Sequence, residues 1–261
     1  MPFTPIHIIA ILPLAFWKRL PFSALAIGCM IPDLPLFLEV IAYGQTHAPW
    51  GPITTCWPIG LATFVIFQCW LKIPLWDILP VWIKQRTEPL SLPNISARPT
   101  FWLLVSVAII IGAYSHICWD AFTHKGRWGT KLLPMLNSEL EIFGRSLPGY
   151  KIFQYGSTLI GLPLLTILCG RKLYLWPANE KIKPGIVTDD KKLIASIILL
   201  VMVVASSGYS LLTYSSWSER IVKSVTNSGL VVAIWSCAYA GYYYWSSSKA
   251  DINAPNHTSH Q

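Results

Sequence analysis

The sequence predicts an all-α fold, a polytopic transmembrane helical bundle of about six full spans preceded by a short N-terminal helix. Of the 261 residues, 53% are hydrophobic and only 12% are charged, whereas a soluble domain has about 25% charged residues. The chain also contains 13 Trp and 11 Tyr, the residues that form aromatic belts at membrane interfaces. Several apolar runs reach the roughly 17 to 25 residues that a helix needs to cross a bilayer.

The first apolar segment, "PIHIIAILPLAFW" (Pro5–Trp17), is too short for a full span, and we expect a re-entrant or half-length helix there. The turn "KRLP" (Lys18–Pro21) follows it. Strands are not expected, because the apolar segments lack period-two alternation and lipid admits only helices and closed barrels. The six predicted full spans lie at about 22–42, 53–71, 101–121, 153–170, 193–213 and 229–246.

We expect one integral membrane domain over residues 1–247, with the recognisable motifs in 1–165, and a disordered polar tail over 248–261. The formal charge is +8, but the basic residues form short clusters between apolar runs. This distribution predicts membrane lipid as the partner and excludes nucleic acid. Dividing the 20 Lys and Arg residues between the two faces gives thirteen against seven, which predicts a plasma (inner) membrane protein with a cytoplasmic C-terminus.

The stretch "SHICWDAFTH" (Ser115–His124) ends the third predicted span with three ionisable side chains, His116, Asp120 and His124. On a helix these residues share one face, each about 6 Å further along the axis. Two imidazoles and a carboxylate on one face suit Zn²⁺, Mn²⁺ or Fe²⁺. The alternative is that His116 and Asp120 pair with each other or with a helix terminus. The six Cys residues contain no C-x-x-C pair, so neither a thiolate zinc site nor a disulfide framework is indicated.

Three further ionisable residues extend this pattern: His7 and His47 fall near the same end of their segments as the His116–His124 face in either orientation of the chain, and Asp33 is expected to lie deeper, below them. Asp33 lies within an apolar run, where an ionised carboxylate costs roughly 2.5 to 3.5 kcal/mol on insertion scales. Taken singly, His7 could cap a helix, Asp33 could cap a broken helix between prolines, and His47 could be a solvated loop residue. Taken together with the His116–His124 face, they favour a metal site over unrelated structural roles.

These same residues carry a resemblance to the domain-of-unknown-function 4184 family of bacterial polytopic membrane proteins. It covers Met1 to about Leu165. More distantly, the pattern is similar to inner-membrane metal-dependent hydrolases, through an N-terminal His and Pro-Asp, Thr-His and Ser-His-x-x-x-Asp-x-x-Thr-x-x-Gly motifs. The chain departs from the hydrolase pattern at Pro35, Leu36 and Ala48. The blocks that carry the family resemblance are, in order, "MPFTPIHIIAILPL", "LPFSALAIGCMIPDLPLFL", "QTHAPWGP", "YSHICWDAFTHKGRWG" and "YKIFQYGSTLIGLPLL".

The resemblance implies a membrane-embedded, metal-dependent hydrolase that acts on a lipid-linked or headgroup ester or phosphoester. The alternative is a non-catalytic membrane protein, either a transporter that uses the same cluster as a proton relay or a structural or regulatory protein. The expected cofactor is a divalent metal, zinc or manganese. The expected metal ligands are His7, Asp33, His116 and Asp120, and the expected catalytic residues are Asp33, His47 and His124.

Overall fold

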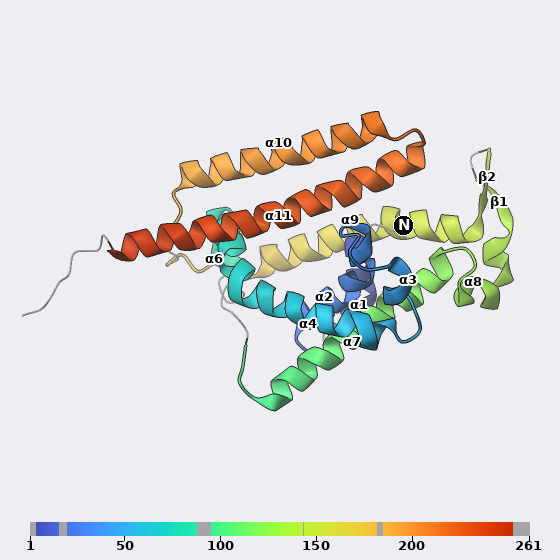
Figure 1. The fold of residues 1–261 in the computed structure, drawn as a ribbon, viewed down its shortest axis with the longest axis horizontal. Coiled ribbons are helices and arrows are strands. Elements are labelled where there is room, and N and C mark those ends of the chain that lie inside the picture. The colour runs from blue at the N-terminus through green and yellow to red at the C-terminus, as the bar shows by residue number, and fades with distance from the viewer. Residues whose placement is uncertain (1–3, 16–19, 88–94, 143, 182–184, 253–261) are drawn as a thin grey trace, which may run out of the picture. The chain divides into compact units, whose positions relative to one another are not determined.

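The protein is described by a computed structural model that covers residues 4–15, 20–87, 95–142, 144–181 and 185–252. Helices dominate it, which confirms the predicted all-α class (Figure 1). Among the described residues, five helices are long and apolar enough to cross a membrane. They are Pro52–Asp77, Pro99–Thr123, Gly149–Leu175, Asp189–Thr213 and Trp217–Lys249.

The sixth expected span, 22–42, does not form one continuous helix. Instead, α2 (Phe22–Met30) passes into the 3-10 helix η2 (Ile31–Leu36), and both belong to an apolar helical segment too short to span. Pro32 and Pro35 lie inside η2, and each lacks the backbone N–H that an α-helix would use. The N-terminal segment is short as predicted: η1 (Thr4–His7) leads into α1 (Ile8–Ala15).

Contacts divide the chain into two compact units. Unit 1 comprises residues 1–66 and 95–175, and unit 2 comprises residues 67–94 and 176–261. The first long helical segment begins in unit 1 and continues into unit 2 after Ile66. It contains two π-helical stretches and consists of η3 (Pro52–Cys56), α4 (Trp57–Ile66), η4 (Phe67–Leu71) and α5 (Lys72–Asp77). The single membrane domain expected over 1–247 stays a prediction.

The core of unit 1 forms where α2 packs against α7 (Pro99–Thr123). Two glycines allow this close approach: a Cβ on Gly28 would collide with the carbonyl oxygen of Ile109, and one on Gly112 with that of Leu25. Small residues at a crossing let two apolar helices pack backbone to backbone, which is the usual means of helix association in lipid. The fully buried side chains around the crossing include Ile11, Leu25, Cys29, Phe64, Val105 and Ile109.

Between α7 and α9 (Gly149–Leu175) the chain folds into short elements rather than an open loop. Gly126, with φ of 76°, makes the turn into α8 (Trp128–Leu132). The 3-10 helix η6 (Pro134–Asn137) follows, and then an antiparallel hairpin of β1 (Glu139–Ile142) and β2 (Arg145–Pro148). The hairpin lies outside the membrane-crossing helices, so the expectation of strand-free apolar segments is not affected.

Unit 2 contains α5, α6 (Val81–Thr87), α10 (Asp189–Thr213) and α11 (Trp217–Ile252). Helices α10 and α11 lie side by side and antiparallel (Figure 1), joined by hydrogen bonds such as Trp235 Nε1 to the Ala195 carbonyl oxygen at 3.2 Å. Because α11 runs to Ile252, residues 248–252 of the predicted disordered tail are helical. Residues 253–261 lie outside the described part of the chain.

Candidate metal centre

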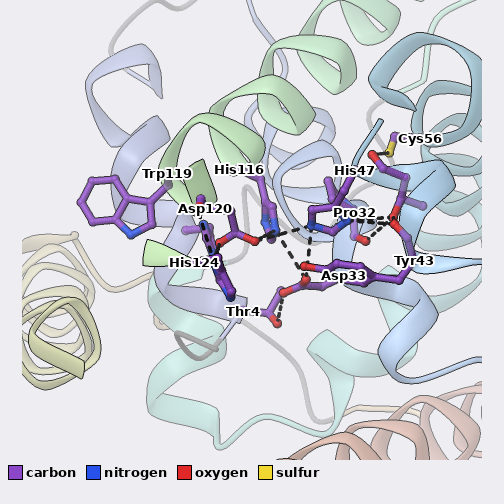
Figure 2. A network of polar contacts seen from close by, with 12 residues as sticks. Thr4, Pro32, Asp33, Tyr43, His47, Cys56, His116, Trp119, Asp120 and His124 are labelled. Atoms are coloured by element: carbon purple, nitrogen blue, oxygen red, sulfur yellow. Dashed lines mark hydrogen bonds and ion pairs between the residues drawn. The ribbon is translucent and has the colours of Figure 1, made fainter. Parts of the chain in front are cut away.

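Four buried side chains, Asp33, His47, His116 and Asp120, converge in unit 1 (Figure 2). Each offers one ligand atom, and these atoms all lie within 4.8 Å of one another. Asp33 comes from η2, and His47 ends α3 (Tyr43–Thr46). His116 and Asp120 lie one turn apart on α7, as their spacing predicts. Three separate parts of the chain therefore supply one group of imidazoles and carboxylates.

The distances within this group fit ligands around a common centre. The His116 Nε2 atom lies 3.5 Å from both Asp33 Oδ1 and Asp120 Oδ2, and His47 Nε2 lies 3.5 Å from Asp120 Oδ2 and 3.9 Å from Asp33 Oδ1. These separations exceed a normal hydrogen bond. Three of the four match the roughly 3.3 to 3.6 Å between atoms that each lie about 2.0 to 2.2 Å from a tetrahedral metal, and the fourth, at 3.9 Å, is somewhat longer.

Several of the converging atoms are buried without a hydrogen-bond partner: Asp33 Oδ1, His47 Nε2 and His116 Nε2. An unsatisfied buried polar atom costs about 1 to 3 kcal/mol, and such atoms are rare in native structures. A divalent cation at their centre would satisfy all three at once. The donor set, two imidazoles and two carboxylates, is one that Zn²⁺ and Mn²⁺ accept, so the residues present fit the expected metal.

The outward-facing nitrogens of both histidines are held by the backbone. His116 Nδ1 lies 2.8 Å from the Cys29 carbonyl oxygen, and His47 Nδ1 lies 3.2 Å from that of Tyr43. A carbonyl oxygen can only accept, so Nδ1 is the donor in each of these contacts, and in the neutral form of each ring Nε2 keeps its lone pair for the centre. Metal-binding histidines in proteins are oriented by the same kind of contact. On the carboxylate side, Thr4 Oγ1 donates to Asp33 Oδ2 at 2.7 Å.

His7 and His124 lie beside the group, and each contacts Oδ1 of Asp120, the carboxylate oxygen that does not face His47 and His116. His7 stacks on the His116 ring with centroids 3.9 Å apart, and its Nε2 lies 3.7 Å from Asp120 Oδ1. His124 Nδ1 lies 3.4 Å from the same oxygen, and its Nε2 lies 3.2 Å from Gln154 Nε2. His124 is not helical, because α7 ends at Thr123. Burial lowers the pKa of His124 below its usual value, which favours the neutral imidazole.

All six residues singled out in the sequence thus come together, although the four-membered group contains His47, expected as catalytic, and not His7, expected as a ligand. Sequence reasoning missed the supporting groups, which are Thr4, the Cys29 carbonyl, Tyr43, Thr46 and Gln154. One signal was present: a threonine directly precedes both His47 and His124, and its hydroxyl lies 3.0 and 3.1 Å from Nδ1 of its neighbour.

Two pockets lie in unit 1, and one of them reaches the group. One, of about 240 Å³, is lined by His47 and Asp120 of the group together with Tyr114, Cys118, Arg127 and Trp128. The other, of about 320 Å³, is almost wholly apolar. It runs between the N-terminal segment, α7 and α9, and its lining includes Ile6, Ile9, Trp119, Phe153, Ile160 and Leu164.

Comparison with known proteins identifies the family and nothing further. No curated protein and no solved structure matches the chain. The similarity to metal-dependent hydrolases therefore rests on the motifs alone. The family match covers residues 1–244 and so continues well beyond the motif-bearing part that ends near Leu165. On the strength of that match the chain belongs to the family described as domain of unknown function DUF4184.

Proposed function

We propose that the protein is a membrane-embedded, metal-dependent hydrolase of a lipid-linked or headgroup ester or phosphoester. The observation that carries the proposal is the group of Asp33, His47, His116 and Asp120, whose buried, unsatisfied ligand atoms face one another. The group also opens to a pocket through His47 and Asp120, so a substrate could reach it. An ion site that served only to stabilise the fold would need no such opening.

A divalent metal supplies the chemistry of hydrolysis when bound, because it lowers the pKa of a bound water to about 7 and polarises the scissile bond. The chain's own residues would bind the metal and transfer a proton. Asp33 and Asp120 provide the negative charge that retains a cation, and the two Nε2 atoms of His47 and His116 complete the set. His124 is the candidate for proton transfer, because its side chain is 23% exposed and adjoins Asp120.

The apolar pocket supports a lipid-linked substrate. Its lining residue Ile6 directly precedes His7, and Trp119 directly precedes Asp120, so an acyl chain lying there would bring its polar end near the group. The pocket is lined by α7 and α9, both of which are long and apolar enough to cross the membrane. An inner-membrane location with the C-terminus in the cytoplasm is part of the proposal and follows from the Lys and Arg count.

Elemental analysis of the detergent-purified protein tests the metal. We expect about one equivalent of zinc or manganese in the wild type and a near-complete loss in His116→Ala and in Asp120→Ala. Asp189→Ala is the control, because Asp189 lies in unit 2 with 87% of its side chain exposed. Near-zero metal in all four proteins would contradict the proposal.

Hydrolysis is tested separately with the same proteins. Release of a labelled headgroup from total membrane lipid should require the metal and should fall to background in His124→Ala, whose metal content stays at the wild-type level. A metal-loaded wild type that releases no headgroup would contradict hydrolysis and favour the non-catalytic alternative.

A further inference from the structure

We infer that the 240 Å³ pocket beside the metal group is an anion subsite in which Arg127 binds the phosphate of a phosphate ester substrate. The inference rests on the proposed function and narrows it from esters in general to phosphate esters. The residues that line the pocket include His47 and Asp120 of the metal group and also Arg127. Arg127 carries the one permanent positive charge among the described residues that line it.

The charges of the site favour an anion once a metal is present. Asp33 and Asp120 contribute two negative charges, which a divalent cation neutralises. Arg127 then leaves the site with one excess positive charge. Among the described residues, no carboxylate forms an ion pair with Arg127. A neutral ester would leave this charge uncompensated, whereas a phosphate would pair with both the metal and the guanidinium.

The backbone fixes Arg127 in this position. Gly126 adopts a φ of 76°, a conformation that suits glycine, and turns the chain so that Arg127 becomes the N-cap of α8. The Arg127 carbonyl oxygen accepts a hydrogen bond from Thr130 Oγ1 at 2.9 Å. Gly129 packs α8 directly onto α7, since a Cβ there would lie 2.6 Å from the Ala121 carbonyl oxygen.

The guanidinium lies over the ring of Tyr43, with 5.9 Å from its carbon to the ring centroid. Tyr43 in turn stacks on His47, with ring centroids 3.8 Å apart. The arginine is thus connected to the metal group through one aromatic side chain.

Size and geometry both favour a phosphate. The pocket, at about 240 Å³, is smaller than the roughly 300 to 1,000 Å³ of sites that enclose a drug-sized ligand. It therefore fits the reacting group of a substrate and not a whole lipid. The planar fork of an arginine matches the oxygens of a phosphate in a bidentate manner. The phosphate could belong to a phospholipid headgroup or to a soluble phosphate ester, and the same subsite would bind either.

Titration calorimetry with inorganic phosphate tests the subsite on the metal-loaded, detergent-purified protein. We expect phosphate to bind the wild type and to bind Arg127→Gln about 10- to 100-fold more weakly, as loss of a charged hydrogen-bonding group predicts. Arg127→Lys should fall between the two, because it keeps the charge and loses the fork. Lys131→Gln is the matched control: Lys131 is an exposed cation on the same helix, and its loss should leave phosphate affinity unchanged.

Metal content, measured on each sample, separates this inference from the proposed function. Arg127→Gln should keep the wild-type metal content and thermal midpoint. A metal-loaded wild type that does not bind phosphate, or an Arg127→Gln variant that binds it equally well, would overturn the subsite and leave the metal centre standing. A wild type that holds no metal would overturn both.

Competition then identifies the source of the phosphate. Mixed micelles that contain dioleoyl phosphatidic acid should displace inorganic phosphate if the ligand is a lipid headgroup, whereas micelles that contain dioleoylglycerol, which has the same acyl chains and no phosphate, are the control for detergent effects. Displacement by glycerol 3-phosphate but not by phosphatidic acid would point to a soluble ester. Either displacement supports the subsite, and displacement by neither overturns it.

Discussion

Among the residues that the structure describes, two buried clusters of ionisable side chains, one in each unit, differ in how their charges are balanced. In unit 1 the carboxylates of Asp33 and Asp120 face imidazole nitrogens. In unit 2 Asp77 faces two lysines, with Lys192 Nζ 3.3 Å from Asp77 Oδ2 and Lys84 Nζ 3.8 Å from Asp77 Oδ1. All three residues of the second cluster are buried.

The two clusters differ in whether their own side chains provide the positive charge that balances the buried carboxylates. In the Asp77 cluster, fixed opposite charges already face one another, and Lys84 Nζ also lies 3.3 Å from the Asp77 carbonyl oxygen. In the metal group, the Nε2 atoms of His47 and His116 face carboxylate oxygens, so when both rings are neutral with Nδ1 protonated, acceptors face acceptors. Such a group is stable only with an added cation or with protons. Burial of charge therefore does not by itself indicate a ligand site, whereas burial of acceptors against acceptors does.

The largest effect is expected from breaking the pair in unit 2. Asp77→Asn leaves two buried lysines without a counter-charge and should lower the free energy of unfolding by about 3 to 5 kcal/mol, seen as a large drop in thermal midpoint. Asp189→Asn is the matched control, because it pairs with the same Lys192 at 3.8 Å but is 87% exposed, and exposed pairs contribute little. Equal shifts in the two variants would show that Asp77 is not the structural partner.

The same change in the metal group should behave differently. In the absence of metal, the histidines around Asp120 can bind or release protons as its charge changes, so Asp120→Asn should lower the thermal midpoint much less than Asp77→Asn does. Adding metal at about 100 times its dissociation constant should stabilise the wild type by about 2.7 kcal/mol and the variant hardly at all. If Asp120→Asn destabilised the metal-free protein as strongly as Asp77→Asn, the distinction between the two clusters would fail.

A third test changes the crossing of α2 and α7, which supports the site, and leaves the ligand residues themselves unchanged. Gly112→Ala places a Cβ against the Leu25 carbonyl oxygen and within 2.7 Å of the Cys29 amide nitrogen. Such overpacking costs about 1 to 3 kcal/mol. It should also weaken metal binding, because His116 is oriented by the Cys29 carbonyl oxygen on the same stretch of α2. Thermal midpoint and metal affinity are the measurements.

Gly208→Ala in α10 is the control for the glycine change. A Cβ at Gly208 meets no atom within 4 Å, so alanine should stabilise the helix by up to about 1 kcal/mol. Metal affinity should not change. Loss of metal binding in this variant as well would mean that the effect of Gly112→Ala does not arise from the α2–α7 crossing.

How far the sequence predicts this fold depends on the length of each element. Apolar runs gave the five long helices, but the 22–42 run contains Pro32 and Pro35, which divide it into α2 and η2. A hydropathy average over the whole run does not register these two prolines, so the prediction included a sixth span at 22–42. The four-residue strands β1 and β2 are at the lower limit of the length over which alternation indicates a strand, and their pairing is a tertiary property.

The site was predictable where it depends on spacing. His116 and Asp120 are four residues apart on one helix, so their common face follows from helical geometry. The supporting contacts join residues far apart in the chain: Thr4 and Asp33 are separated by 29 positions, and His116 and Cys29 by 87. No local sequence pattern indicates which carbonyl or hydroxyl group will hydrogen-bond to a ligand residue, because the packing of α2 on α7 determines which groups meet.

The smallest effect on stability, and the sharpest on the metal, is expected at Thr4. Thr4→Val keeps the side chain's shape and removes the 2.7 Å hydrogen bond to Asp33 Oδ2, at a cost of about 0.5 to 1.5 kcal/mol. Loss of a partner behind a ligand typically weakens metal binding about 10- to 100-fold. Thr54→Val is the control, since the Thr54 hydroxyl bonds only the carbonyl oxygen of Trp50 on the protein surface. Unchanged metal affinity in Thr4→Val would show that this hydrogen bond does not orient Asp33 for metal binding. The contact would then only stabilise the fold, as the Asp77 cluster does in unit 2.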